Sequence, residues 1–144
     1  QRKYHGISTQ IIAQIKNVRV PFNVDIGVGD IIVPRAEERT INTQLPDFEA
    51  PVIKTYSLES TIAEKFDAIL QRFELTGRMK DFYDIYYLSR TFDFEGAKLQ
   101  AAIFETLQRR GTPYDRDSFK RVVALADDED MQKRWKFFLK TIKD

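Results

Sequence analysis

Residues 57–84 read SLESTIAEKFDAILQRFELTGRMKDFYD, and they predict two helices that carry charged side chains on their apolar faces. On the first helix, five apolar residues recur at spacings of three and four and define one buried stripe: Leu58, Ile62, Phe66, Ile69 and Phe73. At about 100° per residue, Glu59 falls inside this stripe and Lys65 falls on its border. We therefore expect charged groups at the buried face of this helix.

The second predicted helix also carries charged residues on an apolar face. Asp81 and Asp84 share one face with Ile85 and Leu88, so two carboxylates one turn apart are predicted to point inward. A lone buried charge is costly, so these groups need partners, a metal or a ligand. The simpler alternative is a structural salt-bridge cluster, which would contain Lys65, Arg78, Lys80, Glu59, Asp81 and Asp84.

The composition is that of an ordinary globular protein. The chain has 144 residues, 42% of them hydrophobic and 31% charged, which suits one domain over 1–144. Its net charge of +1 gives no global attraction to nucleic acid. The absence of cysteine and the single histidine, His5, exclude disulfides, zinc knuckles and histidine metal clusters. With neither a long apolar run nor a secretory signal, the sequence predicts a cytoplasmic protein with no membrane partner.

The first part of the chain, 1–56, is predicted to be sheet. Apolar residues alternate on both sides of Lys16-Asn17, and a two-residue turn there makes a hairpin over 7–26. In this register, residue 15 pairs with 18, 13 with 20 and 11 with 22, and all the apolar residues share one face. Asp25 falls on the opposite face, across from Ser8.

Short strands at 31–33 and 52–56 complete the expected sheet, with a charged loop over 35–51 between them. Ser57 is a predicted N-cap, and Gly77 and Gly111 are predicted helix ends. The helical part, 57–144, is expected to hold helices at 58–75, 80–92, 95–109, 116–125 and 130–142. The fold class is therefore α+β, a small antiparallel sheet followed by a helical bundle.

Asp25 is a second candidate for chemistry. A strand carboxylate followed by Gly27 and Gly29 suits a hard cation such as Mg²⁺, because small residues let a phosphate approach the backbone. An edge-strand aspartate that caps the turn at Gly27 is the alternative, and local evidence favours it. Aromatic residues at 82–87 could stack a base, and basic residues near the C-terminus could bind RNA, but a core and a solvated surface explain them better.

Three motifs in order resemble the AbiEii-type nucleotidyltransferase toxin family. They are NVDIGVGD at 23–30, YSLESTIAEK at 56–65 and RMKDFYD at 78–84, and the likeness continues to the QRRGT that ends the middle helix. These proteins are toxins of type IV toxin–antitoxin and abortive-infection systems, with a polymerase-β-like fold. The resemblance implies a transferase that moves a nucleotide from a nucleoside triphosphate to an acceptor, in some members RNA, with Mg²⁺. It also implies a cognate antitoxin.

By position, the resemblance implies a role for each charged residue of these motifs. Asp25 would bind the metal, with Asp30 supporting its loop. Lys65 would hold triphosphate oxygens, and Asp81 would act as general base or would orient the acceptor. The remaining residues would bind the cofactor or support the site: Arg78, Lys80, Glu59 and Asp84. We expect Asp25, Lys65 and Asp81 to converge on one cleft, with head groups within about 10 Å.

One departure from the family pattern limits this expectation. Family members carry a Gly-Ser and an Asp-x-Asp pair on earlier strands, whereas this chain has no Gly-Ser and no such pair before Asp25. We therefore expect the chain to be incomplete and inactive alone, because Mg²⁺ keeps its waters unless several charged ligands converge. The alternative is a non-catalytic remnant that acts as a protein-interaction or RNA-binding module.

Overall fold

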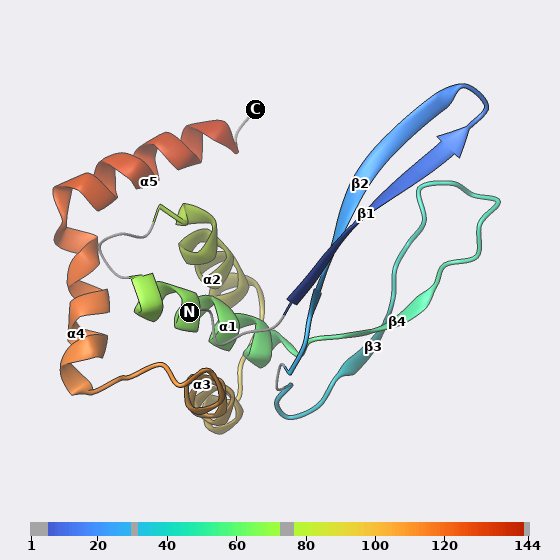
Figure 1. The fold of residues 1–144 in the computed structure, drawn as a ribbon. Coiled ribbons are helices and arrows are strands. Elements are labelled where there is room, and N and C mark those ends of the chain that lie inside the picture. Colours follow the sequence, from blue (N-terminus) through green and yellow to red (C-terminus); the bar gives the residue numbers. More distant parts are fainter. Residues whose placement is uncertain (1–5, 30–31, 73–76, 143–144) are drawn as a thin grey trace. The chain divides into compact units, whose positions relative to one another are not determined.

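A computed structural model describes residues 6–29, 32–72 and 77–142. It divides the chain into two compact units, 1–30 and 31–144, and each is described by itself. The secondary structure is of the α+β class that the sequence predicts, with two antiparallel hairpins and five α-helices in the described part (Figure 1). The single domain over 1–144 stays a prediction.

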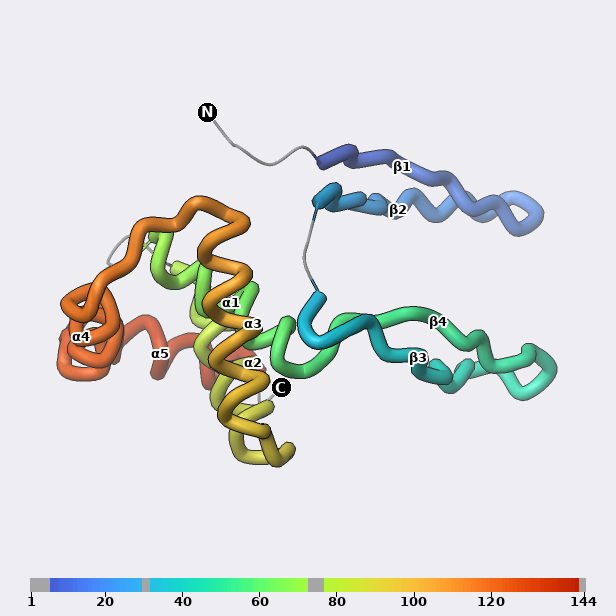
Figure 2. The backbone as a smooth tube through the Cα atoms, turned by 90° about the horizontal axis from the view of Figure 1, so that it is seen from below, coloured from blue at the N-terminus to red at the C-terminus, as the bar shows by residue number. Residues whose placement is uncertain are grey.

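The first unit contains one long hairpin. Strand β1 (Gly6–Ile15) pairs with strand β2 (Val18–Gly27), and the two run side by side in Figure 2. The predicted register is confirmed, because Ile15 pairs with Val18 and Ile11 with Phe22. Alternation of apolar residues on both strands fixes this register, since a slip by one residue would move every apolar side chain to the other face.

The second unit begins with a shorter hairpin, in which β3 (Glu37–Thr40) pairs with β4 (Val52–Thr55). Strand β4 was expected, but the predicted strand at 31–33 is wrong for the residues described there, and β3 lies in the predicted loop instead. Val33 cannot join a ladder because its backbone is bound by Ser60 and Ser57. The charged run can form a strand because Glu38 faces Lys54 across the exposed ribbon.

Five helices follow, and all five were predicted within a few residues. Helix α1 lies between α2 and α3 in Figure 1, and α5 packs on α2. The bounds are α1 (Leu58–Arg72), α2 (Met79–Thr91), α3 (Gly96–Arg110), α4 (Arg116–Ala124) and α5 (Glu129–Thr141), with a 3₁₀ turn, η2 (Leu125–Asp127), before α5.

The core of the helical unit is built around α1. Its predicted stripe is buried at Ile62 and Ile69, and half-buried at Leu58 and Phe66, while Phe73 lies outside the described residues. A second, less apolar stripe is also buried, and it consists of Ser60, Ala63, Asp67 and Leu70. Because two faces of α1 are covered, charged residues on either face must find partners. No helix in the described part is long and apolar enough to span a bilayer.

Candidate functional site

The start of α1 is fixed by two serines. Ser57 is the predicted N-cap, and its hydroxyl oxygen accepts a hydrogen bond from the Ser60 backbone N–H at 3.1 Å. Both hydroxyls also donate to the carbonyl of Val33, and the Val33 N–H donates to Ser60 Oγ at 2.7 Å. These bonds tie the segment that precedes β3 to the first turn of the helix.

About one and a half turns after Ser60 on α1, charged residues of α1 and α2 meet. The Lys65 cluster consists of Lys65, Arg78, Asp81 and Asp84. Lys65 Nζ lies 2.5 Å from Asp84 Oδ2 and 3.8 Å from Asp81 Oδ1, and Arg78 Nε lies 2.7 Å from Asp81 Oδ2. The spacing of Asp81 and Asp84 explains this geometry, since one turn of α2 aims both carboxylates at α1.

The Lys65 cluster is buried at one end and open at the other. The Asp81 side chain is 4% exposed, whereas those of Lys65 and Arg78 are 22% and 50% exposed. Although Arg78 Nε is close to Asp81 Oδ2, this oxygen accepts no hydrogen bond of good geometry from the described residues. The cluster therefore combines a buried carboxylate with two cations that an anionic ligand can reach from solvent.

The other predicted site residues do not join this cluster. Lys80 is exposed on α2 and Glu59 is half-buried on α1, and neither forms an ion pair with a described residue of the Lys65 cluster. Asp25 is exposed on β2 and pairs with Ser8, as predicted. It lies in the first unit, so its convergence with Lys65 and Asp81 stays a prediction. Asp30 and His5 lie outside the described residues.

The donors in the described residues do not by themselves fit a Mg²⁺ site. No group of three or more His, Cys, Asp or Glu side chains in 6–29, 32–72 and 77–142 is placed to hold a metal ion. Asp81 and Asp84 are already paired with cations. Mg²⁺ prefers several oxygen ligands in octahedral geometry, which one carboxylate such as Asp25 does not supply.

A second ionic cluster, on the opposite side of α1, was not predicted. The Asp67 cluster consists of Glu64, Asp67, Gln71, Arg110 and Thr112. The Thr112 hydroxyl donates to Asp67 Oδ1, and Gln71 Nε2 donates to Asp67 Oδ2 at 2.9 Å and to Thr112 Oγ1 at 3.0 Å. Arg110 bonds Glu64 and places its Nε 3.6 Å from Asp67 Oδ2.

The sequence held one signal for this second cluster. Arg110 and Thr112 belong to the QRRGT that ends α3, where Gly111 adopts a left-handed conformation with φ 62°. The Thr112 N–H donates to the Leu107 carbonyl at 3.0 Å and so closes the helix end. This turn presents the Thr112 hydroxyl to Asp67, which is 2% exposed. Burial raises the pKa of Asp67 above 3.8, against the opposing effects of Thr112, Arg110 and Gln71.

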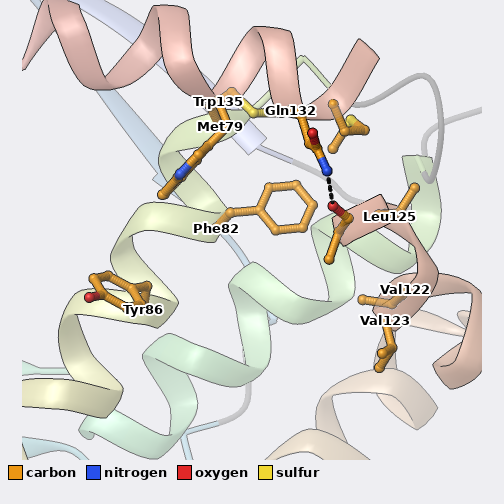
Figure 3. A pocket seen from close by; sticks show the side chains of 10 residues that line it. Met79, Phe82, Tyr86, Val122, Val123, Leu125, Gln132 and Trp135 are labelled. Carbon is orange, nitrogen blue, oxygen red and sulfur yellow. Dashed lines mark hydrogen bonds between the residues drawn. The ribbon is translucent and has the colours of Figure 1, made fainter. Parts of the chain in front are cut away.

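An apolar cavity of about 460 Å³ lies on another face of α2. Figure 3 shows Phe82 and Tyr86 of α2 on one side and Trp135 of α5 on another, and Gln132 donates to the Ala126 carbonyl at 2.9 Å. The predicted aromatic run is thus partly core, because Tyr83 packs against Trp135 at a ring separation of 6.3 Å.

One comparison with known proteins agrees with the family resemblance. The family model described as "Nucleotidyl transferase AbiEii toxin, Type IV TA system" matches residues 1–144. No curated protein and no solved structure matches the chain. A match over the full printed sequence shows the family, and with it the resemblance of the three motifs is confirmed. The chain belongs to the AbiEii nucleotidyltransferase toxin family of type IV toxin–antitoxin systems.

Proposed function

We propose that this protein takes part in the transfer of a nucleotide from a nucleoside triphosphate to an RNA acceptor of the tRNA type. The observation that carries the proposal is the Lys65 cluster, in which a buried carboxylate and two accessible cations meet on consecutive helices. Family membership supports nucleotidyl transfer and an antitoxin partner. The acceptor and the residue roles go beyond it.

In this proposal, Lys65 and Arg78 hold the triphosphate through phosphate oxygens. Both side chains reach solvent, and lysine suits the role of a point charge beside a phosphate. Lys80 is exposed and directly precedes Asp81 in the sequence, and it would add attraction for the triphosphate at longer range. A triphosphate can compete with Asp84 for the Lys65 ammonium group, because the Lys65–Asp84 pair is only partly buried.

Asp81 would act on the acceptor. An acceptor hydroxyl oxygen forms a bond to the α-phosphorus, the bond from that phosphorus to the bridging oxygen breaks, and pyrophosphate leaves with the electron pair. The hydroxyl proton passes to the Asp81 carboxylate, which lies beside Lys65 and Arg78. Mg²⁺ held by Asp25, the support from Asp30, Glu59 and Asp84, and a cytoplasmic location remain proposals from resemblance or composition.

A labelling experiment tests this function. The purified chain is incubated with labelled nucleoside triphosphates, Mg²⁺ and total tRNA, beside a fusion that places a family segment with Gly-Ser and Asp-x-Asp before Gln1. We expect label on RNA with the fusion and none with the chain alone. A folded fusion that binds triphosphate but labels no RNA would contradict the proposal and favour a non-catalytic binding module. Mg²⁺-dependent labelling by the chain alone, lost in Asp25→Ala, would contradict the expectation that the chain is inactive alone.

A further inference from the structure

Helix α1 carries its two ionic clusters on opposite faces, two residues apart. At about 100° per residue, Lys65 and Asp67 point in directions that differ by about 200°. Lys65 contacts α2 through Asp84, whereas Asp67 contacts the end of α3 through Thr112. The rotation of α1 about its own axis therefore sets the positions of both side chains at once.

The contacts of Asp67 form a closed ring. Thr112 donates to one carboxylate oxygen and Gln71 to the other, and Gln71 also donates to Thr112. Arg110 adds its charge beside Asp67 and is itself bonded to Glu64, which lies one turn before Asp67 on α1. Each partner limits the movement of another, so the ring resists both rotation and sliding of α1 against α3.

The α3 end of this ring is itself fixed. Thr112 follows Gly111, whose left-handed φ of 62° ends the helix, and the two residues donate to the Gln108 and Leu107 carbonyls. Thr112 is 6% exposed. Its hydroxyl therefore has a defined place, and α1 is held against a rigid point.

We propose that Asp67, with Thr112, Gln71 and Arg110, is a positioning residue that fixes the rotation of α1 and so places the Lys65 ammonium group between Asp81 and Asp84. This inference rests on the proposed function, in which Lys65 holds phosphate. A site of this kind needs its groups held within about 0.5 Å and 10–20°, which packing of neighbouring residues supplies. Lys65 is long and partly exposed, so it depends on its helix for this precision.

The chain provides a closely matched pair of threonines for the test. Thr112→Val removes a hydroxyl that donates to Asp67, and Thr112→Ser keeps one. Thr106→Val on α3 is the control, because Thr106 is 2% exposed and its Oγ1 has no hydrogen-bond partner among the described residues. Gln71→Met removes a different donor to Asp67 and serves if Thr112→Val does not fold.

Two measurements on the full chain separate this inference from the proposed function. The first is the NMR signal of the Lys65 ammonium group without ligand, identified by its loss in Lys65→Arg. The second is the affinity for a nucleoside triphosphate. Both are made well below the unfolding temperature of each variant, so that a stability effect alone changes neither.

We expect Thr112→Val or Gln71→Met to shift the Lys65 signal toward that of a solvated lysine, with Thr112→Ser and Thr106→Val like the parent. Triphosphate affinity should fall about tenfold, by analogy with the lower end of the loss for residues that orient metal ligands. An unchanged Lys65 signal in folded Thr112→Val and Gln71→Met would overturn the inference, even if triphosphate binds. A shifted signal in a chain that binds no triphosphate would support positioning and would contradict the proposed function.

Discussion

The two ionic clusters around α1 differ in how fully their buried carboxylates are hydrogen-bonded, although Arg110 Nε of the Asp67 cluster also donates no hydrogen bond of good geometry to a described residue. In the Asp67 cluster, a carboxylate that is 2% exposed receives bonds from a hydroxyl and an amide, and an arginine is shared with Glu64. In the Lys65 cluster, an equally buried carboxylate, Asp81, has one oxygen without a good hydrogen bond, beside an arginine that is 50% exposed.

This difference separates a cluster that holds helices together from one that can bind a ligand. A buried carboxylate whose two oxygens both accept hydrogen bonds, as in Asp67, holds elements together, and adding a ligand there would break good contacts. A cluster whose cations reach solvent loses less when a phosphate enters. The charge pairing alone does not distinguish them, because both contain two carboxylates and at least one cation.

Removal of Arg110 should give the largest effect on stability. Arg110→Met removes the cation that Asp67 and Glu64 share, and we expect the free energy of unfolding to fall by about 3 kcal/mol. Arg78→Met is the matched control, with a loss of about 1 kcal/mol or less, because Arg78 is half exposed and Lys65 remains near Asp81. Urea denaturation of the two variants measures both. Equal losses would break the contrast between the clusters.

Removal of Lys65 should lower activity strongly and stability little. In the fusion that transfers nucleotide, Lys65→Ala should lower the rate of transfer by about a hundredfold or more, as for loss of one well-placed group at a transition state. Its unfolding free energy should change by less than about 1 kcal/mol, because the Lys65–Asp84 pair is partly exposed. Lys98→Ala, which removes a surface partner of Glu95, is the control and should transfer normally. A marked loss of stability with activity retained would identify Lys65 as a structural residue.

The pH dependence of stability should show a smaller effect that belongs to the Asp67 cluster. The pKa of Asp67 is raised in the folded protein, mainly by burial, from its ordinary value of 3.8. Between 3.8 and the raised pKa, the folded state holds a proton on Asp67 that the unfolded state has lost. The free energy of unfolding therefore decreases as pH rises through this window. The difference in unfolding free energy between the parent and Asp67→Asn should therefore fall across that window. A difference that rises with pH would contradict the assignment.

The sequence predicted pairing of Lys65, Arg78, Asp81 and Asp84 within a larger set that included Lys80 and Glu59, but it missed the Asp67 cluster for a physical reason. Asp81 and Asp84 stand on an apolar face of one helix, so their spacing alone shows that they conflict with burial. Asp67 lies on a stripe of small and polar residues that looks exposed, and its partners Arg110 and Thr112 come from the end of a distant helix. Periodicity describes one helix at a time and does not show which helix covers its second face.

The same limit applies to the strands. The register of β1 and β2 could be predicted because both strands alternate apolar and polar residues about one tight turn. Strand β3 could not, because Glu37, Glu38 and Arg39 carry no apolar pattern and are paired through β4 instead. Ser57 and Gly111, in contrast, act as the cap and the helix end that local chemistry predicts.

Titration of the purified chain with a nucleoside triphosphate at low salt, followed by NMR, tests the central claim most directly. We expect shifts at the Lys65 ammonium and at the Arg78 guanidinium that weaken as salt is added, with little change at Gln71 or Thr112. Binding should disappear in Lys65→Ala and persist in Lys98→Ala. Shifts confined to Trp135 and the apolar cavity, or equal binding by Lys65→Ala, would contradict the assignment of the open cluster as the nucleotide site.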